Sequence, residues 1–325
     1  MLAEVSLPFS GSISSDCDAA RQRSIAWGRR HGLIVTPADE RRYRAADIPD
    51  LMARWLPQAH GTALDLGVDA LTFAALLDDQ FDGACVDDPA VATRALAPLQ
   101  QVLDSNHTPR DASPLVTAFA DVWQRQAAGK PHYWQQRAAV HWRWFFEAFV
   151  EESSIRSGAI PMSIEEYLAL RRKSGVVAMM VDLIEAAYGF ETTPRVRDVP
   201  LIQDVLRIAM DLVDSINDLF SLAKEESRGD VHNLVLVIQR ENGRTREQAL
   251  TDVRANIQQW CQDFTQGQER LAAACAHLSS SEQSCTRSLV NGMCDAIGGF
   301  PHWSRRSGRY SQLVPVGQPA YRACL

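Results

Sequence analysis

The sequence has no long apolar run and no closely paired cysteines. No segment of its 325 residues approaches the roughly 18 consecutive apolar residues of a membrane span, so we expect no such span. The N-terminal stretch lacks the basic region and apolar core of a secretory signal peptide. The seven cysteines are scattered without a CxxC pair, so we expect neither a disulfide nor a zinc site. These absences favour a cytoplasmic protein.

Positive charge is also scarce. The chain holds 33 Lys and Arg against 40 Asp and Glu, which gives a formal net charge of −7. Nucleic-acid-binding domains usually carry a concentrated basic surface that releases counterions from the phosphate backbone. We therefore expect no nucleic-acid partner, and any anionic ligand must be bound by a few local residues.

Alternating, strand-like segments are missing as well. Apolar residues recur mainly at three- and four-residue spacing, and 46% of the residues are hydrophobic. This pattern predicts an all-α fold made of one large helical bundle. No linker or repeat divides the chain, so residues 1–325 are expected to form a single domain with poorly ordered tails at 1–17 and 312–325. The predicted helices span 18–31, 39–56, 62–80, 88–104, 112–127, 131–154, 163–189, 198–225, 231–241, 246–276 and 281–298.

Three acids follow an apolar helical stretch, at Asp78, Asp79 and Asp82. On a helix Asp78 and Asp82 share one face, whereas Asp79 points about 100° away. Neighbouring carboxylates repel one another unless cations neutralise them, and oxygen ligands of this kind suit Mg²⁺. The motif alone is equally compatible with an acidic helix end that merges into a solvated loop.

A second polar stripe consists of Asn217, Ser221 and Glu225, with Lys224 beside it. The spacing of four residues places an amide oxygen, a hydroxyl and a carboxylate along one side of a helix. Such a stripe can hold one hard cation and leave room for water or phosphate oxygens. The solvated face of an amphipathic helix is the alternative, but it would not explain this mixture of donors near a second acidic motif.

The motifs DDQFD, NDLFSLAKE and WSRRSGRY, in that order and at these separations, resemble the bacterial-type class I terpene synthases with a single α domain. The resemblance covers roughly residues 20–311. It implies the class I terpenoid synthase fold with a central active-site cavity, three Mg²⁺ ions and a prenyl diphosphate substrate. It also implies a terpene cyclase, a carbon–oxygen lyase acting on phosphates, and a homodimer as the expected assembly.

The resemblance also implies roles for individual residues. Asp78 would ligate two ions with support from Asp79 and Asp82, and the stripe of Asn217, Ser221 and Glu225 would hold the third. The family places a diphosphate-sensing arginine 46 positions before the triad asparagine, which is Arg171 here, with linker and effector residues at Ser174 and Gly175. A glycine within a helical pattern costs about 1 kcal/mol, so a helix break is expected there. The diphosphate would be bound by Arg171, Lys224, Arg309 and Tyr310.

Aromatic faces stabilise cations without acting as nucleophiles, so the cavity should contain them. Trp303 is the first candidate, because the family has a pocket aromatic six positions before the arginine of the Arg-Tyr pair. Phe81 is a further candidate. The aromatic run of the 131–154 helix is a weaker source of cavity residues, and simple core packing is the alternative for each of its members, Trp142, Trp144, Phe145, Phe146 and Phe149.

The length of the substrate stays open. Related sesquiterpene synthases frequently have aromatics three and four positions before the first aspartate, where this chain has Ala75 and Ala74. Smaller side chains should leave a roomier cavity, which weakens the choice of farnesyl over geranylgeranyl diphosphate. We favour farnesyl diphosphate and a cyclic sesquiterpene product, with a diterpene synthase as the alternative.

Other protein classes account for less of the sequence. A chain-elongating prenyltransferase would need a second aspartate-rich motif, and a class II cyclase would need DxDD, which is absent. A ferritin-like di-iron bundle needs Glu-x-x-His pairs, and none of the eight histidines has a glutamate three positions before it. A catalytically silent helical metal-binding or interaction protein would not explain the second metal stripe together with Arg171, Arg309 and Tyr310.

Overall fold

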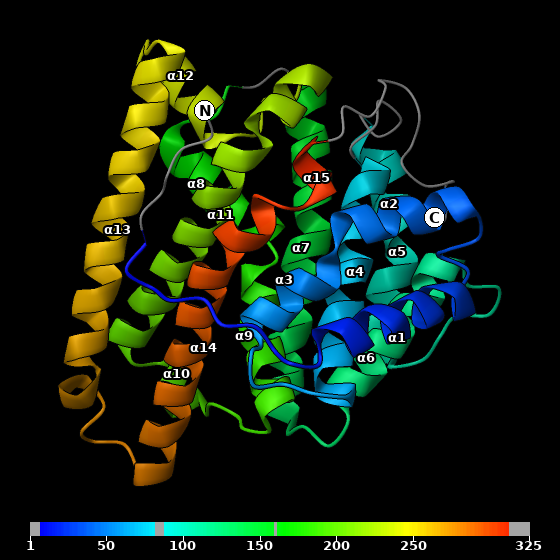
Figure 1. The fold of residues 1–325 in the computed structure, drawn as a ribbon, viewed down its shortest axis with the longest axis horizontal. Coiled ribbons are helices and arrows are strands. Elements are labelled where there is room, and N and C mark those ends of the chain that lie inside the picture. The colour runs from blue at the N-terminus through cyan, green and yellow to red at the C-terminus, as the bar shows by residue number, and fades with distance from the viewer. Residues whose placement is uncertain (1–6, 82–87, 159–160, 312–325) are drawn as a thin grey trace.

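The computed structural model describes residues 7–81, 88–158 and 161–311, and within these ranges the secondary structure is helical with no strand. The all-α prediction is therefore confirmed (Figure 1). None of the helices in these ranges is long and apolar enough to cross a membrane. The five longest helices are α4 (Thr62–Phe81), α7 (His132–Gly158), α11 (Pro200–Arg228), α13 (Arg246–Ala274) and α14 (Ser280–Ser304).

Shorter helices complete the bundle. Several begin with a side-chain cap, as at Ser163, whose Oγ accepts a hydrogen bond from Glu166 N while the Glu166 carboxylate accepts one from Ser163 N. The shorter helices are α1 (Cys17–Arg30), α2 (Pro37–Ala46), α3 (Ile48–Trp55), α5 (Pro89–Ser105), α6 (Pro114–Ala127), α8 (Ile164–Ser174), α9 (Val177–Tyr188), α10 (Pro194–Arg197), α12 (Leu234–Glu241) and α15 (Gly308–Ser311).

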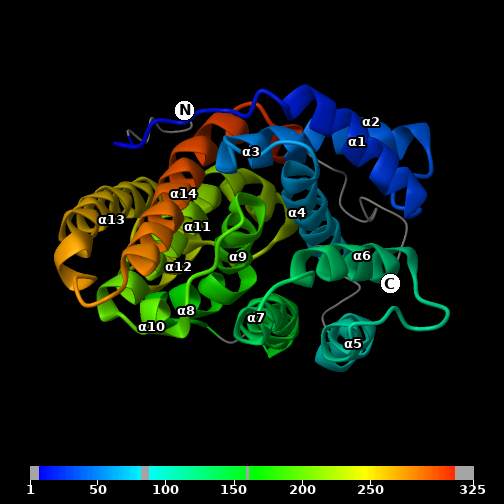
Figure 2. The same ribbon diagram turned by 90° about the horizontal axis from the view of Figure 1, so that it is seen from below.

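The helices are arranged around a centre, as the second view shows (Figure 2). Helices α3, α4, α7, α8, α11 and α14 supply most of the side chains that face this centre. Helix α13 packs on the outside of α11, and α5 packs on the outside of α7. The buried apolar side chains form one large cluster that runs through nearly all of these helices. The site described below is therefore enclosed by a continuous core.

Most predicted helix ranges match the structure, but two predicted helices are each divided. The 39–56 helix breaks at Asp47, which has φ 47° and ψ 50°, and Pro49 lies in the first turn of α3. Proline is favoured in the first turn of a helix, because its fixed φ suits the helix and its missing N–H would have no partner there, so a new helix starts readily at Ile48. The 163–189 helix breaks at Gly175 and Val176, where the sequence predicted a break.

The predicted end of the last long helix at residue 298 is wrong. Helix α14 continues through Pro301 to Ser304. An interior proline usually costs about 3 kcal/mol through a lost hydrogen bond and a steric clash. Here the burial of Phe300 and Trp303, which are 4% and 3% exposed, offsets that cost. The continuation matters because it carries Trp303 to the cavity.

Residues 7–16 differ from the expected poorly ordered tail over 1–17. Ser14 is 2% exposed, and its Oγ donates a hydrogen bond to Ala59 O at 2.8 Å. Its backbone N donates to Ala53 O at 2.8 Å. The ring of Phe9 lies edge-on to Phe264, with centroids 5.5 Å apart. The segment is thus held by both α3 and α13, while residues 312–325 lie outside the described part of the chain.

A buried ionic cluster ties α9 to α7 and α10. The carboxylates of Asp182 and Glu185 are fully buried. Arg137 donates hydrogen bonds to Asp182 at 3.0 Å and to Glu185 at 2.6 Å, and Arg197 donates to Glu185 at 2.5 Å. His141 Nδ1 lies 2.6 Å from Asp182 Oδ2. This cluster fixes the helix that starts directly after the Gly175 break.

We predict that Arg137→Ala lowers the free energy of unfolding by about 3 kcal/mol, because two buried carboxylates lose a shared counter-charge. The matched control is Arg143→Ala on the same helix, since Arg143 pairs with the exposed Asp104 at 2.7 Å. An exposed pair contributes less than about 1 kcal/mol. Chemical denaturation of both variants measures the difference, and equal losses would contradict the structural role of the cluster.

Candidate active site

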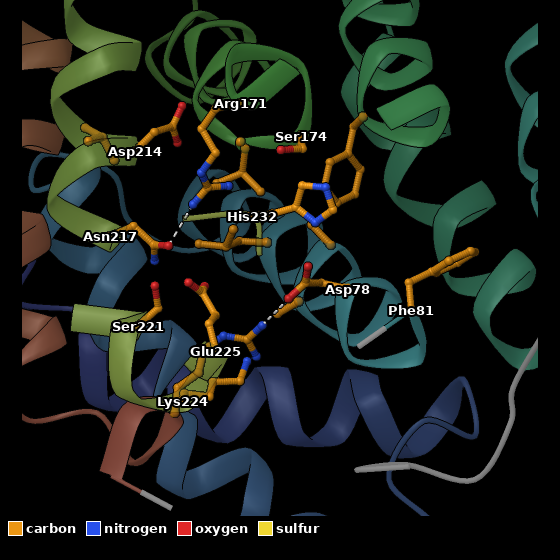
Figure 3. Close-up of a pocket in the computed structure, with 18 of the residues that line it drawn as sticks. Asp78, Phe81, Arg171, Ser174, Asp214, Asn217, Ser221, Lys224, Glu225 and His232 are labelled. Atoms are coloured by element: carbon orange, nitrogen blue, oxygen red, sulfur yellow. Dashed lines mark hydrogen bonds and ion pairs between the residues drawn. The ribbon is translucent and has the colours of Figure 1, made fainter. Parts of the chain in front are cut away.

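A large cavity lies among α3, α4, α7, α8, α11, α14 and α15 (Figure 3). Asp79 is not among the residues that line it, and Asp82 lies outside the described residues. Side chains far apart in the sequence, from residue 74 to residue 310, thus share one space. The predicted site residues that line it are Ala74, Ala75, Asp78, Phe81, Arg171, Ser174, Gly175, Asn217, Ser221, Lys224, Glu225, Trp303, Arg309 and Tyr310.

The acidic motif at the end of α4 faces a guanidinium from the C-terminal part of the chain. Arg309 Nη2 donates a hydrogen bond to Asp78 Oδ2 at 2.6 Å, and Arg309 Nη1 lies 3.2 Å from Asp79 Oδ1. Asp78 is 42% exposed in its side chain, whereas Asp79 is 14% exposed. The two acids therefore differ as the sequence suggested. Asp78 faces the cavity, and Asp79 helps to hold Arg309 in place.

The amide of Asn217 joins two other predicted site residues. Its Oδ1 accepts a hydrogen bond from Arg171 Nη2 at 2.7 Å, and its Nδ2 donates one to the Tyr310 hydroxyl at 2.7 Å. Arg171 Nε also donates to Asp218 Oδ1 at 3.2 Å. The hydrogen bonds thus connect α8, α11 and α15 at one point of the cavity wall, and Figure 3 shows the bond between Arg171 and Asn217.

Glu225 accepts a hydrogen bond from Asn233, a residue that was assigned no role in this site from the sequence. Asn233 Nδ2 donates to Glu225 Oε2 at 2.7 Å and to Asp218 O at 2.8 Å, while Asn233 Oδ1 caps α12 by accepting from Val235 N. Burial, together with the nearby Asp218 carboxylate, raises the pKa of Glu225 to about 8. The hydrogen bond from Asn233 and the charge of Arg171 offset this effect only in part.

The stripe on α11 fits a hard divalent cation. The Oγ of Ser221 is buried and has no hydrogen-bond partner in the part of the chain that the structure describes. A buried hydroxyl without a partner is unfavourable unless something else binds it. Among the described residues, no cluster of three or more His, Cys, Asp and Glu side chains is placed so that it could hold a metal ion. The donor set is instead amide, hydroxyl and carboxylate oxygen, which suits Mg²⁺ better than a transition metal.

The helix break expected at Gly175 is present. Gly175 has φ −69° and ψ 142°, which any residue can adopt. A Cβ at this position would lie only 2.3 Å from Asp214 Oδ1 and 2.5 Å from Asp214 Oδ2. Close approach of the Asp214 carboxyl, rather than backbone freedom, therefore requires a glycine here. The neighbouring Ser174 Oγ is buried without a hydrogen-bond partner among the described residues.

Aromatic rings form one wall of the cavity, on α4 and α7. Phe81 stacks on Phe149 with ring centroids 4.6 Å apart, and Phe145 meets Phe149 edge-on at 4.9 Å. Of the aromatic run on α7, these two phenylalanines line the cavity. The other three members do not: Trp142 and Phe146 are buried in the core, and Trp144 is 38% exposed.

A second aromatic group lies on α3, α14 and α15. Trp303 packs near Phe300 and edge-on to Tyr310, with centroid distances of 5.7 and 5.6 Å. Its Nε1 donates to the carbonyls of Ala46 and Asp47 at 2.9 and 3.0 Å. These two bonds fix the orientation of the indole, so that its ring forms part of the cavity wall.

Several cavity residues were not predicted to line the site. Glu152 and Arg156 continue the helical face of Phe145 and Phe149 at seven and eleven positions after Phe145, so the spacing could have indicated them. Asp230 and His232 also line the cavity. Although burial alone would raise the pKa of Asp230, the hydrogen bonds and charge of His232 lower it to about 2.

Comparison with known proteins decides the family. The family described as "Terpene synthase family 2, C-terminal metal binding" matches residues 69–295. The chain belongs to this family of terpene synthases. It is an enzyme of the carbon–oxygen lyase class that acts on phosphates, a terpene cyclase.

Named relatives agree with this terpene synthase assignment. The chain is 35% identical to pentalenene synthase from Streptomyces avermitilis over 314 residues, which cover 94% of this chain and 92% of the relative. It is 33% identical to a (−)-β-caryophyllene synthase from Saccharothrix espanaensis over 323 residues, which cover 97% and 91%.

Solved structures of terpene synthases share the fold. A single-residue variant of cucumene synthase superposes with a TM-score of 0.84 at 27% identity, over 94% of this chain and 99% of the other. Germacradien-4-ol synthase from Streptomyces citricolor superposes with a TM-score of 0.83 at 27% identity, over 93% and 98%. The class I terpenoid synthase fold is thereby confirmed.

We predict that Gly175→Ala destabilises the protein by about 1–3 kcal/mol, because the added methyl group collides with the Asp214 carboxyl. Adding Asp214→Ala should remove most of this loss. Thermal or chemical denaturation of the two single variants and the double variant gives their coupling energy, which should exceed about 1 kcal/mol. Strictly additive effects would show that the two positions are not in contact.

Proposed function

We propose that the enzyme catalyses the Mg²⁺-dependent ionisation of farnesyl diphosphate and the cyclisation of the resulting allylic cation to a cyclic sesquiterpene, with release of diphosphate. The observation that carries this proposal is a cavity with two chemically different ends, one lined by oxygen donors and basic groups and the other by apolar and aromatic side chains. The relative from Saccharothrix espanaensis, whose name states that it cyclises (2E,6E)-farnesyl diphosphate, supports the choice of substrate.

The charged end would bind metal and diphosphate. Asp78 on α4 and the stripe Asn217, Ser221 and Glu225 on α11 are the proposed Mg²⁺ ligands, and the family resemblance implies three ions. The fit rests on the raised pKa of Glu225 and on the Ser221 hydroxyl, which has no hydrogen-bond partner among the described residues. Bound Mg²⁺ would supply positive charge that stabilises the departing diphosphate. Asp82 stays a prediction, as it lies outside the described residues.

Basic and hydroxyl groups at the same end would hold the diphosphate. Arg171 and Arg309 present guanidinium groups that match pairs of phosphate oxygens, and Lys224 adds a further positive charge. Tyr310 can donate its hydroxyl proton in a hydrogen bond. Arg309 is paired with Asp78 and Asp79, so binding of the diphosphate requires these contacts to be exchanged or shared.

The apolar end would fold and protect the cation. The faces of Phe81 and Trp303 carry negative quadrupole charge, which attracts a cation and forms no bond with it. The apolar and aromatic lining also excludes water until the final step. Arg171 is proposed to connect this end to the charged end. It donates a hydrogen bond to Asn217, and it is followed three and four residues later by Ser174 and Gly175, the proposed linker and effector residues.

The alanines on α4 leave the choice of substrate length open to experiment. Ala74 and Ala75 both line the cavity, beside Asp78. Their small side chains leave space near the ionisation site, whereas the stacked pair Phe81 and Phe149 narrows the cavity one turn further on. Geranylgeranyl diphosphate is the alternative substrate. The single α domain, the homodimer and the cytoplasmic location stay predictions.

Incubation of the enzyme with geranyl, farnesyl and geranylgeranyl diphosphates tests the proposal directly. We expect farnesyl diphosphate with Mg²⁺ to give cyclic sesquiterpene detectable by gas chromatography and mass spectrometry. Removal of divalent ions with EDTA should abolish product, and added Mg²⁺ should restore it. A diterpene from the longest substrate as the main product would move the assignment to a diterpene synthase, and no terpene from any substrate would refute it.

We predict that Asn217→Ala and Glu225→Ala each lower turnover by at least about 100-fold, because each removes a proposed metal ligand. The matched control is Glu226→Ala, since Glu226 is the next residue on α11 and pairs with Arg246 away from the cavity. Turnover is measured as diphosphate release, and circular dichroism reports the helical fold. Near-normal turnover in either ligand variant would show that the stripe does not hold the metal.

A further inference from the structure

Three acids lie along one side of α11, and two consecutive arginines on α8 pair with the outer two. Asp211 accepts hydrogen bonds from Arg172 at 2.6 and 2.9 Å, and Asp218 accepts one from Arg171 at 3.2 Å. The middle acid, Asp214, is 5% exposed. Its Oδ2 is buried and has no hydrogen-bond partner within the described ranges. Among the described residues, the two arginines of α8 thus form hydrogen bonds with Asp211 and Asp218 but not with Asp214.

This remaining carboxyl lies in the cavity. Asp214 is part of the cavity wall together with its neighbour Val213, and its oxygens lie against Gly175. It precedes Asn217 by three residues, which is about 4.5 Å along the helix axis. Figure 3 shows it on the opposite side of Asn217 from Lys224 and Glu225. Asp214 therefore lies beyond the metal stripe, in the part of the cavity wall that Val213 and Gly175 also form.

The surroundings of Asp214 make it an unusually strong base for a carboxylate. Burial raises its pKa to about 8, and the nearby carboxylates of Asp218 and Asp211 act in the same direction against the partial compensation from Arg171 and Arg172. A buried acid without a hydrogen-bond partner is costly, and such groups gather where chemistry needs them. Asp218 is also buried, but Tyr167, Arg171 and the backbone N of Leu234 occupy its oxygens.

We propose that Asp214 is the base that ends the carbocation reaction. This inference rests on the proposed function. In the final step a C–H bond next to the cationic carbon breaks, its electron pair forms the C=C bond of the product, and the proton goes to Oδ2 of the ionised Asp214 carboxylate, which becomes a neutral carboxylic acid. The diphosphate has left earlier with the electron pair of its C–O bond, so charge is balanced. The proton passes to solvent when the product leaves and the cavity opens.

The absence of a side chain at Gly175 is part of the same arrangement. A methyl group there would occupy the space that the Asp214 carboxyl uses. The glycine therefore allows the carboxyl to lie beside the helix break instead of turning back toward Arg172. Asp214 accordingly has a place in the cavity wall that neither Asp211 nor Asp218 shares.

The test compares wild-type enzyme with Asp214→Asn and Asp214→Ala, using farnesyl diphosphate and Mg²⁺. The asparagine keeps the size of the side chain but removes its basicity. We expect formation of the main olefin to fall by about 100-fold. Diphosphate release should continue, with a smaller loss of rate, and the released material should appear as terpene alcohols or as olefins from proton loss at other carbons. The alanine variant serves if the asparagine variant does not fold.

The matched control is Asp211→Asn, one turn earlier on α11, where the acid is paired with Arg172 and does not line the cavity. Its product profile should equal that of the wild type. An unchanged profile in the Asp214 variants, an equal loss of diphosphate release and olefin, or a wild-type enzyme whose main product is an alcohol would overturn this inference. A wild-type enzyme that forms no terpene would instead refute the proposed function.

Discussion

The contacts of Arg171 with Asn217 and Asp218 hold the two halves of the site together. They join α8 to α11 one turn before the break at Gly175, at distances of 2.7 and 3.2 Å. Tyr167, one turn earlier on α8, adds a hydrogen bond to Asp218 at 2.6 Å. Because the same asparagine is bound to Tyr310, the position of α15 depends on this contact as well.

Burial of the Asp218 carboxylate in this connection costs free energy, and the burial of apolar side chains elsewhere in the fold offsets that cost. Burial raises the pKa of Asp218, and the carboxylate stays in the interior because a guanidinium, a phenol and a backbone N–H surround it. Removing charge from water is expensive unless the partners are well placed. The large apolar cluster around α4, α7, α11 and α14 supplies the burial that stabilises the fold around such a polar centre.

Much of the fold and of the charged end could be predicted from sequence, because both follow from helical spacing. The positions of Asn217, Ser221 and Glu225 on one face of α11 need no tertiary information. The division of the 39–56 helix at Asp47 was missed, although Pro49 in the first turn of α3 is a local signal for a new helix. Spacing also could not separate Phe145 and Phe149 from Trp142, because the choice depends on which neighbours α7 packs against.

One physical reason explains why some site residues could not be identified from the sequence. Asp214 looks like another acid on an amphipathic helix, and only the pairing of Arg171 and Arg172 with its neighbours shows that its Oδ2 has no partner among the described residues. Asn233 was assigned no role in this site from sequence, yet its side chain donates a hydrogen bond to Glu225 as well as capping α12. In both cases the role depends on contacts between helices, which a pattern within one helix does not contain.

The anchoring of Trp303 has a consequence for how the enzyme can change. Its indole is held by the backbone carbonyls of Ala46 and Asp47, more than 250 positions away, and by no side chain of those residues. A substitution at Ala46 therefore keeps its backbone acceptor, whereas a change at Asp47, which has φ 47° and binds Arg21 through its side chain, or an insertion or deletion between α2 and α3 would displace the acceptors. The orientation of the ring therefore depends on the length and the backbone conformation of this turn, so length variants of the turn offer a route to altered products that leaves every cavity side chain unchanged.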